Sequence, residues 1–163
     1  MPNVITDTSP IQYLYQIAQL DLLPMLYGQV RMPQAVADEL MQGYVQGISL
    51  PNLDSLSWIR LCAVLSSSLI PNIKNLGVGE REALSLAMTI PDSLVTLDDA
   101  LARSYAQQLN IPITGTLGVL LKGKQAGYVD TIAPLLNELD ALNFRLSPAT
   151  RAAVLRLTNE YPR

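Results

Sequence analysis

Short apolar segments alternate with longer helical patterns along most of this chain, and that alternation limits the folds that it can adopt. The segments at residues 4–6, 29–32, 58–64, 94–97 and 111–114 are predicted strands. Residues with apolar side chains at helical spacing separate them. A strand–helix alternation favours a parallel α/β sheet with right-handed crossovers. We therefore expect an α/β fold with a central parallel sheet of about four to five strands, flanked by helices.

Prolines and glycines mark the expected helix ends. Pro10, Pro33 and Pro148 are each placed to begin a helix, because proline is favoured in the first helical turn. Gly28 and Gly43 are placed to end the helices that precede them. The predicted helices cover residues 10–18, 20–26, 33–42, 80–88, 98–109, 115–126, 130–142 and 148–160, and residues 43–57 and 66–75 are expected to be loops.

The chain is expected to form a single domain over residues 1–163, with a core of about residues 3–145 and a C-terminal helix within 146–163. Its 163 residues are enough to bury a sizeable core, and 49% of them are apolar while 15% are charged, which argues against disorder. No internal repeat, low-complexity tract or interdomain linker interrupts the pattern.

Four carboxylates stand where predicted strands end or helices begin. Asp7 and Asp98 each follow a predicted strand, Glu80 lies in the first turn of a helix, and Glu39 lies at the edge of the apolar face of another. In an open parallel sheet, ligands bind outside the carboxyl ends of the strands. We therefore expect Asp7, Glu39, Glu80 and Asp98 to face one crevice.

The chain contains no histidine. Acids without histidine or cysteine partners indicate a hard cation that prefers oxygen ligands, such as Mg²⁺ or Mn²⁺. The absence of histidine also excludes Ser-His-Asp and Cys-His nucleophile systems and most catalytic zinc sites. Carboxylates gathered in one pocket repel one another, and a divalent cation would remove that conflict and lower the pKa of a bound water.

Each acid also has a structural interpretation, which the sequence leaves open. Asp7 could be a turn or capping residue, Asp98 an N-cap, and Glu80 a charge that favours the helix dipole. Glu39 could be an ordinary solvated helix residue. Asp99 fits a solvated acid at a helix start better than a direct ligand.

Charge and cysteine content bear on partners and compartment. The net charge is −3 and the sequence pI is about 4.8, so the chain lacks the basic face that broad nucleic-acid binding usually needs. Cys62 is the single cysteine and is expected to be a core thiol in a reducing compartment. The N-terminal residues show no signal-peptide pattern and no segment is long enough to span a membrane, so a cytoplasmic location is expected.

Six segments of the chain resemble the PIN-domain nucleases, and in particular the DUF3368 subgroup related to VapC-like toxins. The resemblance extends from about residue 3 to residue 145. The segments are Ile5-Thr-Asp-Thr-Ser-Pro10, Leu20-Asp-Leu-Leu-Pro-Met-Leu26, Met32-Pro-Gln-Ala-Val-Ala-Asp-Glu-Leu40, Leu76-Gly-Val-Gly-Glu-Arg-Glu-Ala-Leu-Ser-Leu-Ala87, Thr96-Leu-Asp-Asp-Ala-Leu-Ala-Arg103 and Ile113-Thr-Gly-Thr-Leu-Gly118.

This resemblance implies a PIN-like fold with an acidic pocket and metal-dependent RNA cleavage, often as the toxin of a toxin–antitoxin pair. The positions that match the acidic catalytic site are Asp7, Glu39, Glu80 and Asp98, and the metal ligands would be Asp7, Glu80, Asp98 and Asp99. Thr8 or Ser9 could orient the Asp7 carboxylate or a metal-bound water, and both are candidate substrate-binding residues.

Substrate contacts and partners are less visible in the sequence. Arg103 could reach an RNA phosphate or pair with an acid, and the segment from Lys122 to Lys124 is interpreted as a solvated helix end. A homodimer or a complex with a small antitoxin is expected to use an apolar helical face, formed by Ile11, Leu14 and Ile17 with Leu22, Leu23 and Leu26.

Two other functions compete with the nuclease. The first is a catalytically weak PIN-like module that acts through protein or nucleic-acid binding. The second is a phosphoryl-transfer protein of the receiver or dehalogenase type. A receiver requires paired acids after its first strand, but the pair Asp98-Asp99 comes late in this chain. The dehalogenase type requires Asp-x-Asp after the first strand, but Asp7 is followed by Thr8-Ser9.

Overall fold

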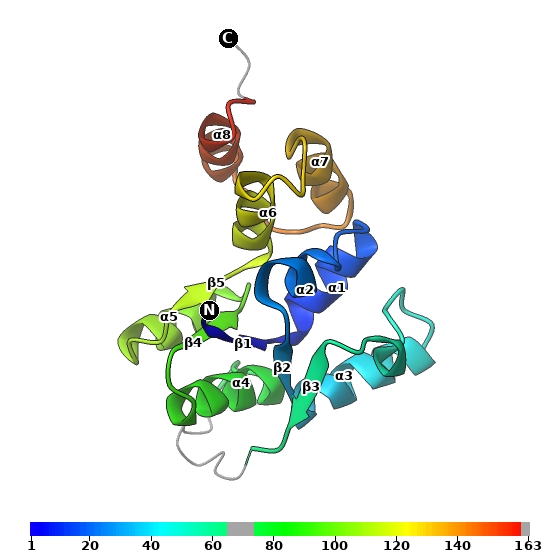
Figure 1. Cartoon of the computed structure of the whole chain (residues 1–163), viewed down its shortest axis with the longest axis vertical. Helices are drawn as coiled ribbons and strands as arrows, with labels where there is room; N and C mark the ends of the chain where they lie inside the picture. Colours follow the sequence, from blue (N-terminus) through cyan, green and yellow to red (C-terminus); the bar gives the residue numbers. More distant parts are fainter. Residues whose placement is uncertain (65–73, 161–163) are drawn as a thin grey trace.

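A computed structural model describes residues 1–64 and 74–160 of the chain (Figure 1). Its centre is a five-stranded sheet in which every neighbouring pair of strands is parallel and the order is β3-β2-β1-β4-β5. The strands are β1 (Asn3–Thr6), β2 (Val30–Pro33), β3 (Ile59–Cys62), β4 (Ser93–Thr96) and β5 (Ile113–Thr114). The predicted α/β fold with a parallel central sheet is confirmed.

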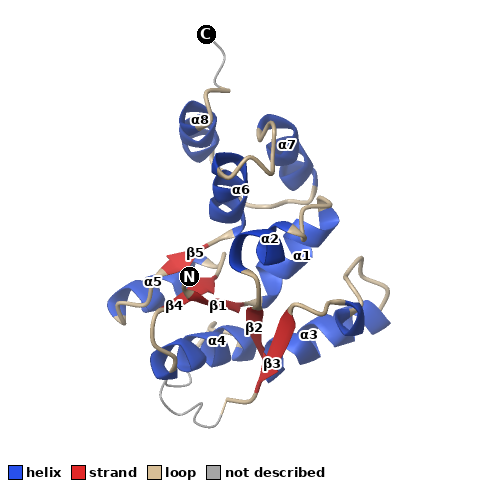
Figure 2. Cartoon of the chain, in the orientation of Figure 1, coloured by secondary structure: helices blue, strands red, loops and turns tan. Residues whose placement is uncertain are grey.

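Helices connect the strands and extend the chain beyond the sheet (Figure 2). They are α1 (Thr8–Gln16), α2 (Leu22–Tyr27), α3 (Gln34–Val45), α4 (Val78–Thr89), α5 (Ala100–Gln108), α6 (Thr116–Gln125), α7 (Ala133–Ala141) and α8 (Pro148–Leu157), with a short 3-10 helix, η1 (Leu53–Ser55). In Figure 1, α6, α7 and α8 rise from the sheet toward the C-terminus. In the described residues, no helix is both long and apolar enough to span a membrane.

Strand order decides where a site can form. The chain runs outward from β1 through β2 to β3 and then starts again on the other side of β1 with β4 and β5. This change of direction is a topological switch point, where ligands bind in open sheets. Thr6 pairs with Thr96 across β1 and β4, and the backbone N–H of Asp7 donates to the Thr96 carbonyl at 3.1 Å. Asp7 and Asp98 therefore leave neighbouring strands at the same edge of the sheet.

Two apolar clusters hold this arrangement, one on each face of the sheet. Successive strand residues point to opposite faces. Val4 and Met32 pack into the cluster that α1, α2, α6 and α7 cover, whereas Ile5 and Val95 pack into the cluster that α4 and α5 cover. All four of these strand side chains are almost fully buried. The sheet is therefore a rigid base for the residues that follow its strands.

Several predicted helix ends differ from the structure, and the two that involve Pro10 and Gly43 have a clear physical reason. Helix α1 begins at Thr8 with Asp7 in the N-cap position, so Pro10 lies within its first turn. Helix α3 continues past Gly43 to Val45. Gly43 is buried, and a Cβ there would lie 2.6 Å from Leu50 Cδ1, so this glycine permits close packing instead of ending the helix.

Two other expectations need revision. The apolar face proposed for assembly is mostly used within the chain, because Ile11, Leu14 and Leu23 are fully buried in the first cluster. Cys62 is only half-buried and packs at the border of the second cluster. The loop predicted over residues 66–75 falls largely outside the described residues.

Candidate active site

Asp7 is the most unusual acid of the chain. It follows β1, it is only 3% exposed, and its Oδ1 atom has no hydrogen-bond partner among the described residues. Burial raises the pKa of this carboxyl group from its usual 3.8 to about 8, and the charges of Glu80, Glu39 and Asp98 add to the effect, although the backbone N–H of Thr8 opposes it. The fold therefore brings three further carboxylates within electrostatic range of a buried acid.

Glu39 reaches the site from the exposed side of α3. Its Oε2 atom accepts a hydrogen bond from the Thr8 hydroxyl, and its Oε1 atom accepts one from the backbone N–H of Gly79 at 3.2 Å. A Cβ on Gly79 would lie 2.9 Å from Glu39 Oε1, so glycine lets the carboxylate approach the first turn of α4. The Thr8 hydroxyl thus positions Glu39, while the backbone N–H of Thr8 contacts Asp7; the sequence had offered Thr8 or Ser9 to orient Asp7 or a metal-bound water, which stays a prediction.

Glu80 lies in the first turn of α4, where the sequence placed it. Its Oε2 atom accepts a hydrogen bond from the backbone N–H of Gly77 at 3.2 Å. Burial raises the pKa of the Glu80 carboxyl group, the Gly77 N–H opposes that shift, and the charges of Asp99 and Glu39 raise the pKa further. Glu80 therefore feels the charges of an acid on α3, Glu39, and of an acid at the start of α5, Asp99.

Asp98 and Asp99 are neighbours in sequence with different surroundings. Asp98 accepts hydrogen bonds from the backbone N–H of Thr116 at 2.8 Å and from its hydroxyl at 2.7 Å, so it caps α6. Burial raises the pKa of Asp98, while both Thr116 contacts and the charge of Arg103 lower it. Asp99 is exposed and caps α5 through the N–H of Ala102 at 3.0 Å.

Backbone N–H groups at helix N-termini therefore donate hydrogen bonds to most of these carboxylates. Glu39 and Glu80 contact the start of α4, Asp98 contacts the start of α6, and Asp99 contacts the start of α5. The positive end of a helix dipole stabilises a carboxylate in such a position. As the side chains stand in residues 1–64 and 74–160, no three acidic or thiol groups meet closely enough to hold one ion. Shared ligation would require some of these acids to turn away from the helix ends.

The chemistry of the donors fits a hard divalent cation. All groups around Asp7 offer oxygen, and the buried Asp7 Oδ1 atom has no partner of its own among the described residues. A buried polar atom without a partner is costly, and it marks the place where a ligand would restore the missing interaction. The roles of Asp7, Glu39, Glu80, Asp98 and Asp99 in metal binding or catalysis remain predictions.

The structure says less about the residues that the sequence predicted to contact a substrate. The Arg103 Nη1 atom donates to the Leu97 carbonyl at 2.8 Å, which holds the guanidinium beside Asp98. Ser9 is half-buried in the first turn of α1, and its side chain makes no hydrogen bond within the described residues. Substrate contact by Thr8, Ser9 or Arg103 stays a prediction.

Sequence reasoning missed two supports of the site. Thr116 is fully buried and donates twice to Asp98. Glu82 of α4 accepts a hydrogen bond from the backbone N–H of Ala35 at 3.0 Å, so it caps α3 while Glu39 of α3 contacts the start of α4. A threonine after the glycine that precedes a helix is a visible capping signal, but the exchange between α3 and α4 depends on their tertiary packing.

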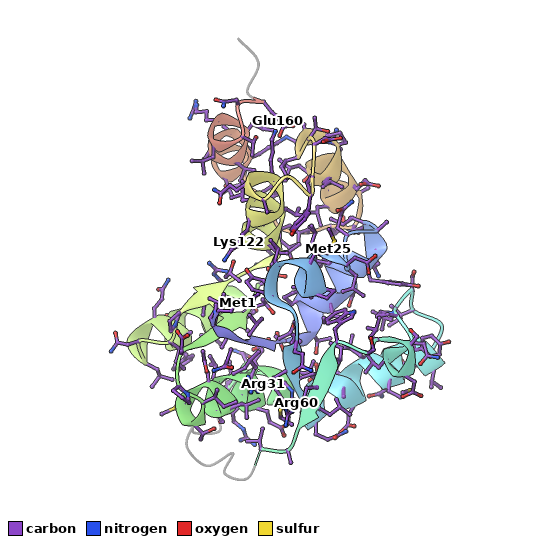
Figure 3. The ribbon with its side chains drawn as sticks, viewed as in Figure 1. Met1, Met25, Arg31, Arg60, Lys122 and Glu160 are labelled. Carbon is purple, nitrogen blue, oxygen red and sulfur yellow. The ribbon has the colours of Figure 1, made fainter. Side chains whose placement is uncertain are left out.

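A second charged cluster lies away from this site, near the C-terminus (Figure 3). Glu160 accepts hydrogen bonds from Lys124 Nζ at 2.7 Å and from the backbone N–H groups of Ile132 and Ala133. Burial favours the neutral acid, but these donors outweigh it and lower the pKa of Glu160 from 4.5 to about 2. The expectation of a solvated end was wrong for Lys124, and Lys122 Nζ lies 5.0 Å from the centre of the Tyr27 ring.

Comparison with known proteins agrees with the fold. The family model DUF3368, which describes a PIN domain, matches residues 3–160. No curated protein matches the chain. The family match favours a nuclease-type site over the receiver and dehalogenase alternatives.

Proposed function

The chain belongs to the DUF3368 family of PIN domains, a nuclease-type family, and from this premise we propose that it is a ribonuclease that depends on Mg²⁺ or Mn²⁺. The observation that supports this proposal most is the buried Asp7 carboxyl group, which has an unpartnered oxygen and three further carboxylates within electrostatic range. A purely structural role would favour a partner for that oxygen, as Glu160 has.

In this proposal, Asp7, Glu80 and Asp98 hold the ion directly, and Asp99 assists from the start of α5. A divalent cation at this place would neutralise the carboxylates, lower the pKa of a bound water and stabilise charge on the phosphodiester. Glu39, which the Thr8 hydroxyl and the Gly79 N–H already orient, would accept a proton from the attacking water. Arg103, beside Asp98, would contact a substrate phosphate.

The acidic composition suits a protein that binds RNA at one site and not over a broad basic face. The net charge of −3 disfavours salt-dependent binding along a long nucleic acid. We further propose a role as the toxin of a toxin–antitoxin pair, with a small antitoxin protein or a second copy of the chain as its partner. Exposed apolar residues at the end of α3, namely Met41, Tyr44 and Val45, offer a surface for such a partner.

A second candidate function is a catalytically weak PIN-like module that acts through binding. One observation favours it: no three of the acids in the described residues meet closely enough to hold an ion without rearrangement. The two candidates differ in whether Asp7, Glu80 and Asp98 can converge when a cation is supplied.

The decisive experiment incubates the purified chain with mixed single-stranded RNAs in Mg²⁺, in Mn²⁺ and in EDTA. We expect cleavage with either metal and none in EDTA. The matched control is Asp7→Asn, which preserves the shape of the side chain but removes the charge. Cleavage by the Asp7→Asn variant would indicate a contaminating nuclease, and cation binding without cleavage by the parent would favour the binding module.

A further inference from the structure

A pocket opens beside Asp98 on the side of the sheet that ends in β5. Its volume is about 310 Å³, and its walls come from β5, from the start of α5, from α6 and from the connection between α7 and α8. That connection passes the lower end of α6 in Figure 1. Its volume is close to the lower limit of small-molecule pockets, roughly 300–1,000 Å³, so it has room for one nucleotide-sized group.

Two guanidinium groups line this pocket, one from α5 and one from the connection between α7 and α8. Arg103 on α5 uses its Nη1 atom to contact the Leu97 carbonyl, and a guanidinium has further N–H donors to offer. Arg145, in the connection between α7 and α8, is exposed and makes no hydrogen bond or ion pair with any described residue. Arginine forks match the geometry of a phosphate group.

The rest of the wall suits the remainder of a nucleotide. Phe144, Leu117 and Ile113 supply apolar surface. The Phe144 ring is held by an edge-to-face contact with Tyr13, with ring centres 4.9 Å apart and an interplanar angle of 87°. An aromatic side chain with a fixed orientation can serve as a platform for a base, because every base has a π-face.

Asp98 ties this pocket to the proposed catalytic centre, because it belongs to both. We propose that the pocket binds a nucleotide adjoining the scissile phosphodiester of single-stranded RNA, with its phosphate on Arg103 and Arg145 and its base against Phe144. This inference rests on the proposed function. It adds Arg145 and Phe144 as residues that position the substrate and that would influence the choice of sequence at one step from the cleaved bond.

An acidic segment of a partner protein is the other ligand that two arginines could attract. Asp98 repels a peptide carboxylate and a phosphate alike, so charge does not separate the two ligands, but a peptide bound beside that acid would have no reaction to serve. An RNA chain instead joins the pocket to the acidic centre covalently, so that a phosphate in the pocket places the next one near Asp7. The structure therefore favours RNA.

The test compares Arg145→Gln and Arg145→Lys with Arg60→Gln. Arg60 is an exposed arginine on β3, at the opposite edge of the sheet from β5, so its substitution removes the same charge far from the pocket (Figure 3). Binding of a short fluorescent oligouridylate is measured by anisotropy in EDTA over a range of salt concentrations, and cleavage is measured separately in Mg²⁺. A glutamate-rich peptide serves as the competing probe.

We expect Arg145→Gln to weaken oligouridylate binding about tenfold and to reduce the slope of log affinity against log salt by about 0.7, the value for one phosphate contact on a single strand. Arg145→Lys should lie between parent and Arg145→Gln, and Arg60→Gln should match the parent. In the cleavage assay, Arg145→Gln should raise KM more than it lowers kcat. Uridine monophosphate should compete with the oligouridylate for the parent but not for Arg145→Gln.

Each other outcome has a defined meaning. Cleavage by the parent with unchanged KM in Arg145→Gln would overturn the pocket and leave the nuclease intact. Arg145-dependent binding of oligouridylate without cleavage in any metal would retain the pocket and overturn the nuclease. Equal losses in Arg60→Gln and Arg145→Gln, or Arg145-dependent binding of the glutamate-rich peptide but not of oligouridylate, would also contradict the proposed nucleotide pocket.

Discussion

Asp7 and Glu160 are both shielded from solvent, but their surroundings move the pKa values of the two carboxyl groups in opposite directions. Asp7 is 3% exposed, lies among other carboxylates and has a pKa of about 8. The Glu160 side chain is 12% exposed, lies against Lys124 and two backbone N–H groups, and has a pKa of about 2. Burial raises the pKa of both carboxyl groups, but the donors around Glu160 outweigh it, whereas at Asp7 the neighbouring carboxylates add to it and only the Thr8 N–H opposes it.

The comparison separates a structural carboxylate, Glu160, from one that we propose to be functional, Asp7. Glu160 has donors for both oxygens and joins the end of the chain to α6 and to the start of α7. Asp7 has an oxygen without a partner, and no basic side chain forms an ion pair with it in the described residues. Unfavourable placement of a charge lowers stability, and it persists where a ligand or a reaction requires it.

The largest difference between the two regions should appear in cleavage. We expect Asp98→Asn to abolish RNA cleavage in Mg²⁺, because it removes a charge that the cation needs, while the variant stays folded. Glu160→Gln should cleave with the kcat of the parent at a temperature where it remains folded. Gel-based cleavage assays with circular dichroism as the folding control measure both, and a loss of kcat in Glu160→Gln would remove the functional distinction.

The pH dependence of stability should differ in sign. A raised folded-state pKa means that the native state retains its proton longer than the unfolded chain, so Asp7 should lower stability as pH rises from about 3.8 to about 8 without metal. Asp7→Asn should remove this slope and raise the free energy of unfolding at neutral pH by on the order of 2 kcal/mol, after the cost of burying the amide.

Urea unfolding of the parent and of Asp7→Asn in EDTA, at several pH values, measures this effect. Addition of Mg²⁺ should stabilise the parent and leave the variant unchanged, since only the parent keeps the complete set of acids. Parallel pH profiles for the two proteins would show that Asp7 is an ordinary carboxylate.

Glu160→Gln should have an effect on stability of similar size but opposite sign. A lowered folded-state pKa stabilises the native state above pH 4.5, and that stabilisation is lost as pH falls toward about 2. We expect a loss of about 2 kcal/mol at neutral pH, reduced from the full shift because Lys124 is 24% exposed and partly screened. Urea unfolding at neutral and acidic pH should show the two proteins converging in acid, with no response to Mg²⁺.

The smallest effect should come from added methyl groups in two glycine positions. A Cβ at Gly115 would lie 2.7 Å from Asp98 Oδ1 and 2.9 Å from Arg103 Nη1, whereas a Cβ at Gly123 would meet Leu22 Cδ2 at 2.9 Å. We expect each alanine variant to lose about 1 kcal/mol of stability. Only Gly115→Ala should also weaken cleavage, because it displaces a polar group of the site; equal kcat/KM values in the two variants would argue against that role.

The contrast between the regions also explains what the sequence could predict. The parallel sheet and the grouping of Asp7 with Asp98 follow from short apolar strands that end in acids, a local pattern. The contact between Glu160 and Lys124 joins α6 to residues near the chain end, and no local sequence pattern predicts it. For the same reason, the sequence mistook Gly43 for a helix end, since only the position of Leu50 shows why a side chain is excluded there.

The surroundings of the proposed catalytic residues depend on contacts that no local sequence pattern shows. Sequence position placed Glu39 and Glu80 near the site, but it did not show that both contact the start of α4. Those contacts arise because α3 and α4 pack against each other, with Glu82 capping α3 in return. In the proposed function, metal binding would therefore compete with helix capping, a balance that depends on tertiary structure and on the supplied cation.

The most direct test of the account is an NMR titration of the Asp7 carboxyl carbon, with and without Mg²⁺. In EDTA, the account predicts a pKa of about 8, raised by burial and by the neighbouring acids. With saturating Mg²⁺, the same carboxyl group should remain ionised down to pH values below its usual pKa of 3.8, because a bound cation favours the charged form. An ordinary pKa in EDTA, or a raised pKa that Mg²⁺ does not change, would contradict the claim that Asp7 is the centre of a metal site.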